Sequence, residues 1–261
     1  MISAKLYKIV YKILANFPFQ TNHVHYLPSC HSTNEVAQDL LQAGVAEGSV
    51  VITDDQFAGK GQSGNVWNSF PGQNLTFSLI LHPAFLAPNE QFLITVILSL
   101  ALKDTLEEIL PGEVKIKWPN DIFFNNRKIA GLLIENVLRG NHYESCVAGI
   151  GLNVNQEDFP EDIMGTSLKM ATNQQYNLNT ILNSLMKSIA GYYQILKEES
   201  RLNLTDAYHQ SLLGIGEERK FKIRKDEFNG IIQGTDEFGR LLVKKGDEIL
   251  VFQHKEIQML F

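Results

Sequence analysis

Cysteine and positive charge are both scarce in this sequence. The 261 residues include two cysteines, Cys30 and Cys146, which are too few for a disulfide framework. Lys and Arg number 23 against 29 Asp and Glu, which gives a formal net charge of −6. A chain with a net negative charge has no extended positive surface to bind a polyanion, so we expect no nucleic-acid partner.

Long apolar runs are also missing. The densest one, residues 92–102, is too short to span a bilayer, so we expect no membrane association. Lysines interrupt the apolar residues at the N-terminus and no small-residue cleavage site follows, which argues against a signal peptide. We expect residues 2–14 to form an amphipathic helix packed on its own protein, and we expect a cytoplasmic location.

Patterns typical of strands and helices are mixed irregularly through residues 1–213. Strand patterns cover residues 24–27, 49–54, 74–81, 113–117, 121–124, 128–136 and 145–154, and helix patterns cover 34–43, 89–110, 178–199 and 205–213. This mixture predicts an α+β fold, with a mixed β-sheet and flanking helices.

The pattern of predicted elements changes at residue 214. Short strand patterns follow one another closely, over residues 219–224, 228–234, 240–244, 248–253 and 256–260, and turn residues separate them. The sequence therefore predicts two domains, residues 1–213 and residues 214–261. The second is expected to be a small SH3-like β-barrel.

A glycine-rich loop runs from Gly59 to Gly64. Its glycine spacing fits the dinucleotide fingerprint, but no helix follows the loop and no acidic residue ends a second strand about 20 residues on. It is not a Walker loop either, because Asn65 follows Gly64. Exposed amides and Lys60 would suit a phosphate, and Trp67 would suit a purine. An ordinary glycine turn beside a core tryptophan explains the same residues equally well.

A β-hairpin is predicted around Asn125-Asn126, which sits between two apolar runs. A two-residue loop would place Phe123 opposite Lys128 and Asp121 opposite Ala130. Asp121 and Lys128 would then share one face of the hairpin. Such a pair could clamp a magnesium-bound phosphate and a developing anion, although a surface salt bridge is the commoner meaning of the same pair.

The segment Gly149–Asn155 alternates small and polar residues. Asn153 and Asn155 would lie on one face of a strand, and the glycines would leave that face bare for a ligand. The alternative is a strand end with turn-forming asparagines.

A helix start is predicted at Ser32. Ser32 and Glu35 have the spacing of a capping box, which is a sufficient structural reason for both residues. The free amides at a helix N-terminus would also suit a polar ligand.

Taken in order, these elements resemble one family, the biotin protein ligases. The resemblance covers about residues 24–170. The C-terminal β module is of the type found in the family, but it carries no distinctive motif. The matching elements are Ser32-Thr33-Asn34, Gln56, Gly59–Gly64, Trp67, Lys117–Asp121, Lys128–Gly131, Gly149–Asn153 and Thr166–Leu168.

The resemblance implies two half-reactions. Biotin would attack Mg·ATP to give biotinyl-5'-AMP, and the biotinyl group would pass to a specific lysine of a biotin carboxyl carrier protein, as in acetyl-CoA carboxylase. Residues 1–213 would then be the catalytic domain that binds biotin and ATP. The implied catalytic residues are Lys128, Asp121 and Lys60, and Asp121 would also face magnesium. The implied biotin-binding residues are Ser32, Thr33, Gln56 and Gly131. The implied adenylate-binding residues are Gly59, Gly61, Gly64, Asn65, Trp67, Asn120 and Asn153.

Two features depart from the family pattern. The family loop usually carries two or three arginines, whereas here Lys60 replaces the first and Gln62-Ser63 stand where arginine is common. Weaker retention of the adenylate is expected. Only about 30 residues precede the first motif, which leaves no room for the DNA-binding domain of some members, so we expect no repressor role. The resemblance leaves room for a homodimer.

Two alternative functions remain open at this point. A lipoate or octanoate ligase shares the fold and an equivalent lysine, but not this glycine-rich loop with its tryptophan. A non-catalytic biotin-sensing regulator would need a DNA-binding or partner-binding module, and the acidic charge and short N-terminus argue against the DNA form.

Overall fold

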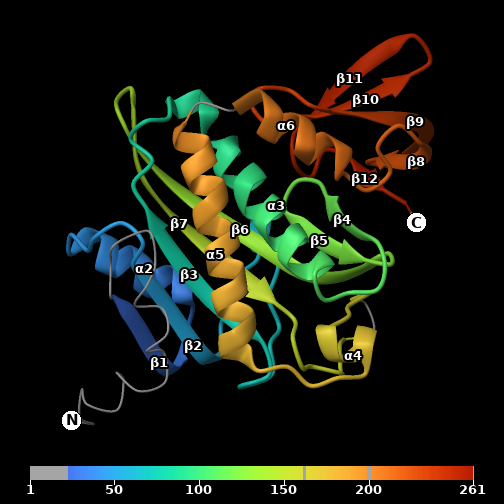
Figure 1. Cartoon of the computed structure of the whole chain (residues 1–261). Helices are drawn as coiled ribbons and strands as arrows, with labels where there is room; N and C mark the ends of the chain where they lie inside the picture. Colours follow the sequence, from blue (N-terminus) through green and yellow to red (C-terminus); the bar gives the residue numbers. More distant parts are fainter. Residues whose placement is uncertain (1–22, 161–162, 199–200, 261) are drawn as a thin grey trace.

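The computed structural model describes residues 23–160, 163–198 and 201–260 (Figure 1). The helix expected over residues 2–14 lies outside these ranges. The described chain forms a seven-stranded sheet of order β1-β2-β3-β7-β6-β5-β4 and a five-stranded sheet of order β11-β10-β9-β8-β12. The α+β architecture, with a mixed sheet and flanking helices, is confirmed.

The large sheet is mixed because one pair of strands is parallel. β1 (Val24–Cys30) runs parallel to β2 (Val50–Gln56), and all other neighbours are antiparallel. The remaining strands are β3 (Leu75–Leu81), β4 (Val114–Lys117), β5 (Asp121–Phe124), β6 (Arg127–Arg139) and β7 (His142–Leu152).

Helices cover both faces of this sheet. α3 (Phe92–Glu107) and α5 (Leu178–Lys197) pack side by side on one face (Figure 1). α2 (Thr33–Gln42) packs on the other face, where Ala37 meets Val51. Because side chains alternate along a strand, neighbouring residues of β2 serve different helices, and all seven positions of β3 are buried. A sheet that helices cover on both faces requires strands that are apolar at nearly every position.

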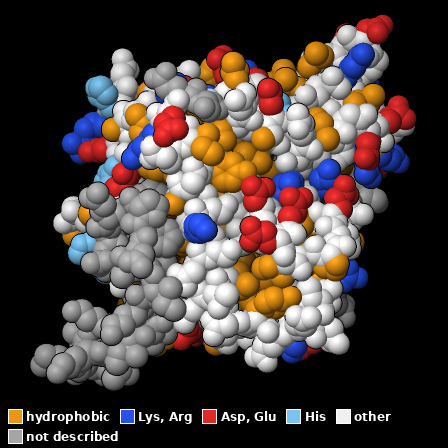
Figure 2. Space-filling view, in the orientation of Figure 1, with side chains coloured by type: hydrophobic (Ala, Val, Ile, Leu, Met, Phe, Trp, Pro, Cys, Tyr) orange, Lys and Arg blue, Asp and Glu red, His pale blue; other side chains and the backbone are white. Residues whose placement is uncertain are grey.

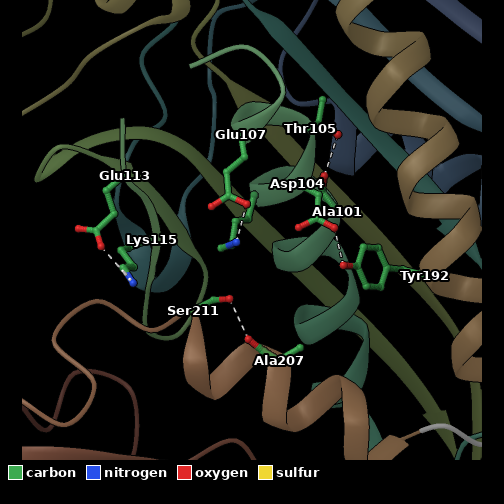
Figure 3. A network of polar contacts seen from close by, with 10 residues as sticks. Ala101, Asp104, Thr105, Glu107, Glu113, Lys115, Tyr192, Ala207 and Ser211 are labelled. Carbon is green, nitrogen blue, oxygen red and sulfur yellow. Dashed lines mark hydrogen bonds and ion pairs between the residues drawn. The ribbon is translucent and has the colours of Figure 1, made fainter. Parts of the chain in front are cut away.

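Polar contacts tie the helical layer together at its outer side. Figure 3 shows Tyr192 of α5 donating to Asp104 of α3 at 2.5 Å. In the same view, Thr105 donates to the carbonyl of Ala101 within α3. The short helix α6 (Arg201–Gln210) follows α5 and packs on α3. The sequence did not predict α4 (Leu168–Thr172), which starts where the Ser167 hydroxyl accepts from the Met170 amide.

The β5–β6 hairpin confirms one pairing and corrects another. Asn125 and Asn126 both have positive φ, 47° and 63°, as a two-residue type I′ loop requires. Phe123 pairs with Lys128 as predicted. Asp121 pairs with Gly131 and not with Ala130, because the register shifts between Ile122 and Phe123.

The C-terminal segment forms an antiparallel sheet of short strands. They are β8 (Glu218–Ile223), β9 (Asp226–Thr235), β10 (Leu241–Lys245), β11 (Glu248–Phe252) and β12 (Gln258–Met259). In the described residues the edge strands β11 and β12 do not pair with each other, so the sheet is open. The prediction of an SH3-like barrel is therefore not confirmed, because closure would need that additional pairing.

Hydrogen bonds join the C-terminal sheet to the rest of the described chain. The Trp118 indole donates to the carbonyl of Gly239 at 2.9 Å, and His209 Nε2 accepts from the amide of Thr235 at 2.9 Å. Gly234 passes so close to the His209 ring that a Cβ there would lie 2.8 Å from Nδ1. The contact between α6 and the C-terminal sheet thus depends on the close approach of the Gly234 backbone to the His209 ring.

Charges of both signs are interspersed over the face shown in Figure 2. Among the helices of the described residues, none is long and apolar enough to cross a membrane.

Candidate active site

A polar cavity opens over the first half of β6 and the C-terminal end of β7. Every site residue named from the sequence lines it except Gly59, Gly64 and Asn153. Its lining comprises Ser32, Thr33, Asn34, Gln56, Lys60, Gly61, Gln62, Asn65, Val66, Trp67, Thr76, Asn120, Asp121, Lys128, Gly131, Leu132, Leu133, Gly149, Ile150, Gly151 and His254. Segments far apart in the sequence therefore meet in one place.

An ion pair occupies the β5–β6 side of the cavity. Lys128 Nζ lies 2.6 Å from Asp121 Oδ1, and their side chains are 30% and 25% exposed. The prediction that the two share a face is confirmed. Gly131 makes room for the pair, because a Cβ there would lie 3.1 Å from Asp121 Oδ1 and 3.2 Å from Lys128 Nζ. Lys128 Nζ also lies 5.7 Å from the centre of the Trp67 ring, on its face.

The opposite side of the cavity is a fixed network of neutral polar groups. Thr33 donates to Gln56 Oε1 through its amide, at 2.8 Å, and through its hydroxyl, at 3.2 Å. The Gln56 amide is thereby oriented, and its nitrogen remains as a donor for a ligand. Asn34 Oδ1 accepts from the Ser78 hydroxyl at 2.6 Å, and Asn34 Nδ2 donates to Glu135 at 2.7 Å.

The capping box predicted at the start of α2 is wrong. Ser32 is the N-cap residue, but its side chain makes no capping hydrogen bond. Instead Ser32 is buried and lines the cavity. Glu35 turns away to pair with Lys60 Nζ at 2.5 Å. This pairing removes the reciprocal partner that a capping box needs.

The glycine-rich loop is held by its own backbone. Residues Gln62–Gly64 form one turn of 3-10 helix, and Lys60 bridges Val66 across the loop. A side chain at position 59 would collide with the carbonyl of Trp67, so glycine is required there for packing. The hydrogen bond to Glu35 raises the pKa of Lys60, so this cation is engaged by a carboxylate at the rim.

The floor of the cavity is bare backbone. A Cβ at Gly149 would collide with the Asn34 side chain, and one at Gly151 would collide with the Trp67 ring. Trp67 therefore lies directly over Gly151. Its indole nitrogen is buried and has no hydrogen-bond partner. A buried donor left without a partner is costly, which suggests that a ligand completes it.

A second, smaller pocket lies beyond Trp67. It is lined by Val66, Trp67, Asn68, Lys128, Asn153, Phe159, Pro160 and Ile163. Asn153 is 4% exposed and donates to the carbonyl of Thr166 at 3.0 Å, while its Oδ1 is buried without a partner. β7 ends at Leu152, so Asn153 and Asn155 lie past the strand. Asn155 bonds the backbone of Tyr176, which gives it a structural role.

The comparisons with known proteins agree with this geometry. Residues 26–153 match the model of the biotin/lipoate A/B protein ligase family. The chain is 28% identical over 223 residues to a biotin–[acetyl-CoA-carboxylase] ligase of Paracoccus denitrificans, covering 82% of this chain and 90% of that protein. The chain is thus similar to biotin protein ligases along most of its length.

Two further relatives extend this result. A bifunctional ligase/repressor BirA of Bacillus subtilis is 29% identical over 242 residues, covering 91% of this chain and 74% of that protein. A biotin protein ligase of Aquifex aeolicus, solved in complex with biotin and ATP, superposes with a TM-score of 0.76 at 27% identity. That match covers 92% of this chain and 99% of the Aquifex chain.

A residue that follows the C-terminal strand β11 also reaches the cavity. His254, in the turn between β11 and β12, lines the cavity, and its ring lies 6.1 Å from that of Trp118, edge to face. No sequence motif marks His254, since the C-terminal strands carry none. Asn34 was matched within a motif but was given no role. The glycines at 149 and 151 were expected to be bare, but nothing in the sequence indicated which side chains they face.

A groove between the two domains leads into the same cavity. We call it the interdomain groove; its lining includes Lys117, Trp118, Asp121, His254 and Lys255. It shares Asn65, Asn120, Asp121 and His254 with the cavity, so the two are continuous. Burial lowers the pKa of Lys117, with Lys128 acting in the same direction and Asp121 opposing both.

The residues present do not build a metal site held by the protein. In the described part of the chain no three His, Cys, Asp or Glu side chains gather to hold an ion. Asp121 is the sole acidic residue in the described cavity lining, and Lys128 already neutralises it. Magnesium commonly keeps its waters and binds substrate phosphates. The ion would therefore enter with ATP as part of the substrate, and a magnesium contact at Asp121 stays a prediction.

Proposed function

We propose that this protein activates biotin with ATP to biotinyl-5'-AMP and transfers the biotinyl group to a lysine of a biotin carboxyl carrier protein. The observation that carries the proposal is the Lys128–Asp121 pair set beside a fixed amide network in one cavity. The relatives named as biotin ligases, and the Aquifex structure that holds biotin and ATP, support the same reaction.

Lys128 is the proposed cation for the first half-reaction. Negative charge accumulates where the biotin carboxylate meets the α-phosphate, and a compact ammonium on a flexible stem can bridge both groups. Asp121 holds Lys128 in place before ligand binds, at 2.6 Å. Catalysis would rest on positioning and charge stabilisation, because the reaction needs no protein nucleophile.

The neutral network is the proposed biotin pocket. The ureido ring of biotin carries one carbonyl and two N–H groups, so it needs both donors and acceptors. Ser32, Thr33 and Gln56 supply them on one wall, and Gly131 leaves the strand open beside Lys128. Charged groups there would have to be desolvated, which neutral amides and hydroxyls avoid.

The smaller pocket is the proposed adenine site. Asn153 Oδ1 is an unpaired acceptor, and the exocyclic amine of adenine is a donor. Trp67 gives the base a ring face to stack on. Asn65 and Asn120 line the cavity that holds the ion pair, and so do Lys60 and Gly61 of the loop. Gly59 and Gly64 would act by shaping the loop.

The partners follow from the reaction and from the surface. The acceptor is proposed to be the biotin carrier of acetyl-CoA carboxylase, which the name of the Paracoccus relative mentions. The formal net charge of −6 disfavours nucleic acid. The homodimer and the cytoplasmic location stay predictions.

The decisive experiment is isotope exchange. Labelled pyrophosphate should enter ATP only when biotin is present, because the first half-reaction is reversible. GTP should not replace ATP, since its O6 would face Asn153 Oδ1, acceptor to acceptor. A protein that binds biotin without exchanging pyrophosphate would instead be a non-catalytic biotin sensor.

The family model also covers lipoate ligases, so the choice of acid needs its own measurement. Biotin, lipoate and octanoate should be compared for exchange and for their effect on the melting temperature. Biotin is expected to be the sole active acid, because the polar wall at Thr33 and Gln56 has no counterpart in the apolar tail of octanoate. Exchange with lipoate or octanoate alone would assign the protein to the other branch of the family.

A further inference from the structure

One histidine of the C-terminal domain stands where the central cavity opens to solvent. His254 lines both the cavity and the interdomain groove. Its ring meets Trp118 edge-on, and the residue is exposed on its outer side. A group that reaches the ion pair through the groove must therefore pass this imidazole. Protons taken up there can leave to solvent.

The second half-reaction needs an unprotonated amine. A lysine has an ordinary pKa of about 10.4, so at neutral pH on the order of one acceptor lysine in a thousand carries a free lone pair. That amine must also lose a proton as it bonds to the acyl carbon, and a base at the entrance to the cavity can accept this proton. General bases of this kind contribute about a hundredfold or more to a rate.

The charges around His254 favour its neutral form. Lys117 faces it from β4, Asp121 from β5 and Lys128 from β6, while Lys255 adjoins it in its own turn. Partial burial lowers the pKa of His254, and Lys255 acts in the same direction, while Asp121 opposes them. Asp121 is already paired with Lys128 at 2.6 Å, which limits its pull on a proton at the imidazole.

We infer that His254 accepts the proton that the acceptor amine loses as it attacks the adenylate from the interdomain groove. This inference rests on the proposed function. The free amine forms a bond to the acyl carbon, and the neutral imidazole accepts the proton that the nitrogen then loses. The bond from that carbon to the phosphate oxygen breaks, and AMP leaves with the electron pair. The imidazolium passes its proton to solvent.

The test compares His254→Asn with His142→Asn, a matched change at an exposed histidine at the start of β7. Full-length proteins are loaded with biotinyl-AMP, and single-turnover transfer is measured to the carrier protein and to hydroxylamine, which is unprotonated at neutral pH. His254→Asn should slow transfer to the carrier lysine about a hundredfold, and transfer to hydroxylamine much less. His142→Asn should change neither rate.

The pH profile gives a second readout. On the acid side of the His254 pKa, the wild-type transfer rate should rise about a hundredfold per pH unit, because the amine and the imidazole must both be unprotonated. The His254→Asn rate should instead rise about tenfold per pH unit, since it depends on free amine alone. Added imidazole should restore part of the rate at neutral pH.

Two outcomes would overturn the inference. The first is wild-type transfer by His254→Asn, with the same steep rise on the acid side. The second is an equal loss with the carrier and with hydroxylamine, which would make His254 a positioning residue. Failure of the proposed function itself would show separately, as absence of biotin-dependent pyrophosphate exchange in the wild type.

Discussion

The floor and the mouth of the cavity are built in contrasting ways. The floor comes from β6 and β7 of one sheet. Gly131 has no side chain and leaves room for the Asp121–Lys128 pair, and Gly151 leaves room for the Trp67 ring. The mouth is shared between two domains and depends on contacts such as Trp118 to Gly239. Strand pairing fixes the floor along its length, whereas the mouth depends on a few separate hydrogen bonds. Changes to the floor should therefore affect chemistry and ligand affinity, and changes to the mouth should affect how the domains are coupled.

The largest expected effect on the floor is that of Lys128→Ala. Loss of the cation where charge develops should slow biotin-dependent pyrophosphate exchange on the order of a hundredfold or more. Folding should change little, because Asp121 is 25% exposed and water can solvate it. Lys115→Ala is the matched control, since Lys115 pairs with Glu113 away from the cavity. Near wild-type exchange by a folded Lys128→Ala protein would remove this residue from the mechanism.

Trp67→Ala should have the next largest effect, on ATP more than on biotin. An aromatic stack on a base contributes roughly 1–3 kcal/mol, by analogy with stacking on nucleic acids. Lys128 would also lose the ring face that lies 5.7 Å from its ammonium. Calorimetric titration with each ligand gives the two affinities. Equal weakening of both, or of neither, would make Trp67 a packing residue.

A smaller effect is expected from Gly151→Ala. The added methyl collides with the Trp67 ring, and overpacking of this kind costs roughly 1–3 kcal/mol. If Trp67 shifts to relieve it, the dissociation constant for ATP should rise about tenfold. Gly191→Ala serves as the control, because a Cβ in that part of α5 meets nothing within 4 Å. Unchanged ATP affinity would show that Trp67 can move without consequence.

The mouth should show the smallest effect, as a dependence of stability on pH at His209. Burial lowers the pKa of His209, with Asp206 opposing, and the neutral ring accepts from the Thr235 amide. A lowered pKa means that this stabilisation is complete above the unfolded value of about 6.5 and is lost as the pH falls through the folded value. Wild-type melting temperature should therefore fall between pH ~8 and pH ~5 by more than that of His209→Gln.

The control for that measurement is His142→Gln, which removes an exposed histidine from the same protein. Its melting temperature should follow the wild-type curve across the range. A His209→Gln protein with the full wild-type pH dependence would show that the junction does not sense this proton. Other half-buried histidines with a lowered pKa, such as His25, would then be responsible.

Much of the catalytic domain could be predicted because its signals are local. The hairpin loop at Asn125-Asn126 depends on two residues that tolerate positive φ, and the structure has them there. The shared face of Asp121 and Lys128 follows from strand alternation, and the 2.6 Å ion pair confirms it. The capping box failed because its partner Glu35 was drawn away by Lys60, 25 positions along the chain, which no local pattern reveals.

The sequence by itself determined the order of the motifs, the strands and helices that carry them and the residue types in the cavity. Periodicity and turn chemistry act over a few residues, so they can be seen in a single chain. Tertiary structure alone decided the register shift that pairs Asp121 with Gly131, the openness of the C-terminal sheet and the arrival of His254 at the cavity. These depend on contacts between segments that are distant in sequence, whose geometry is set by packing and not by any one segment.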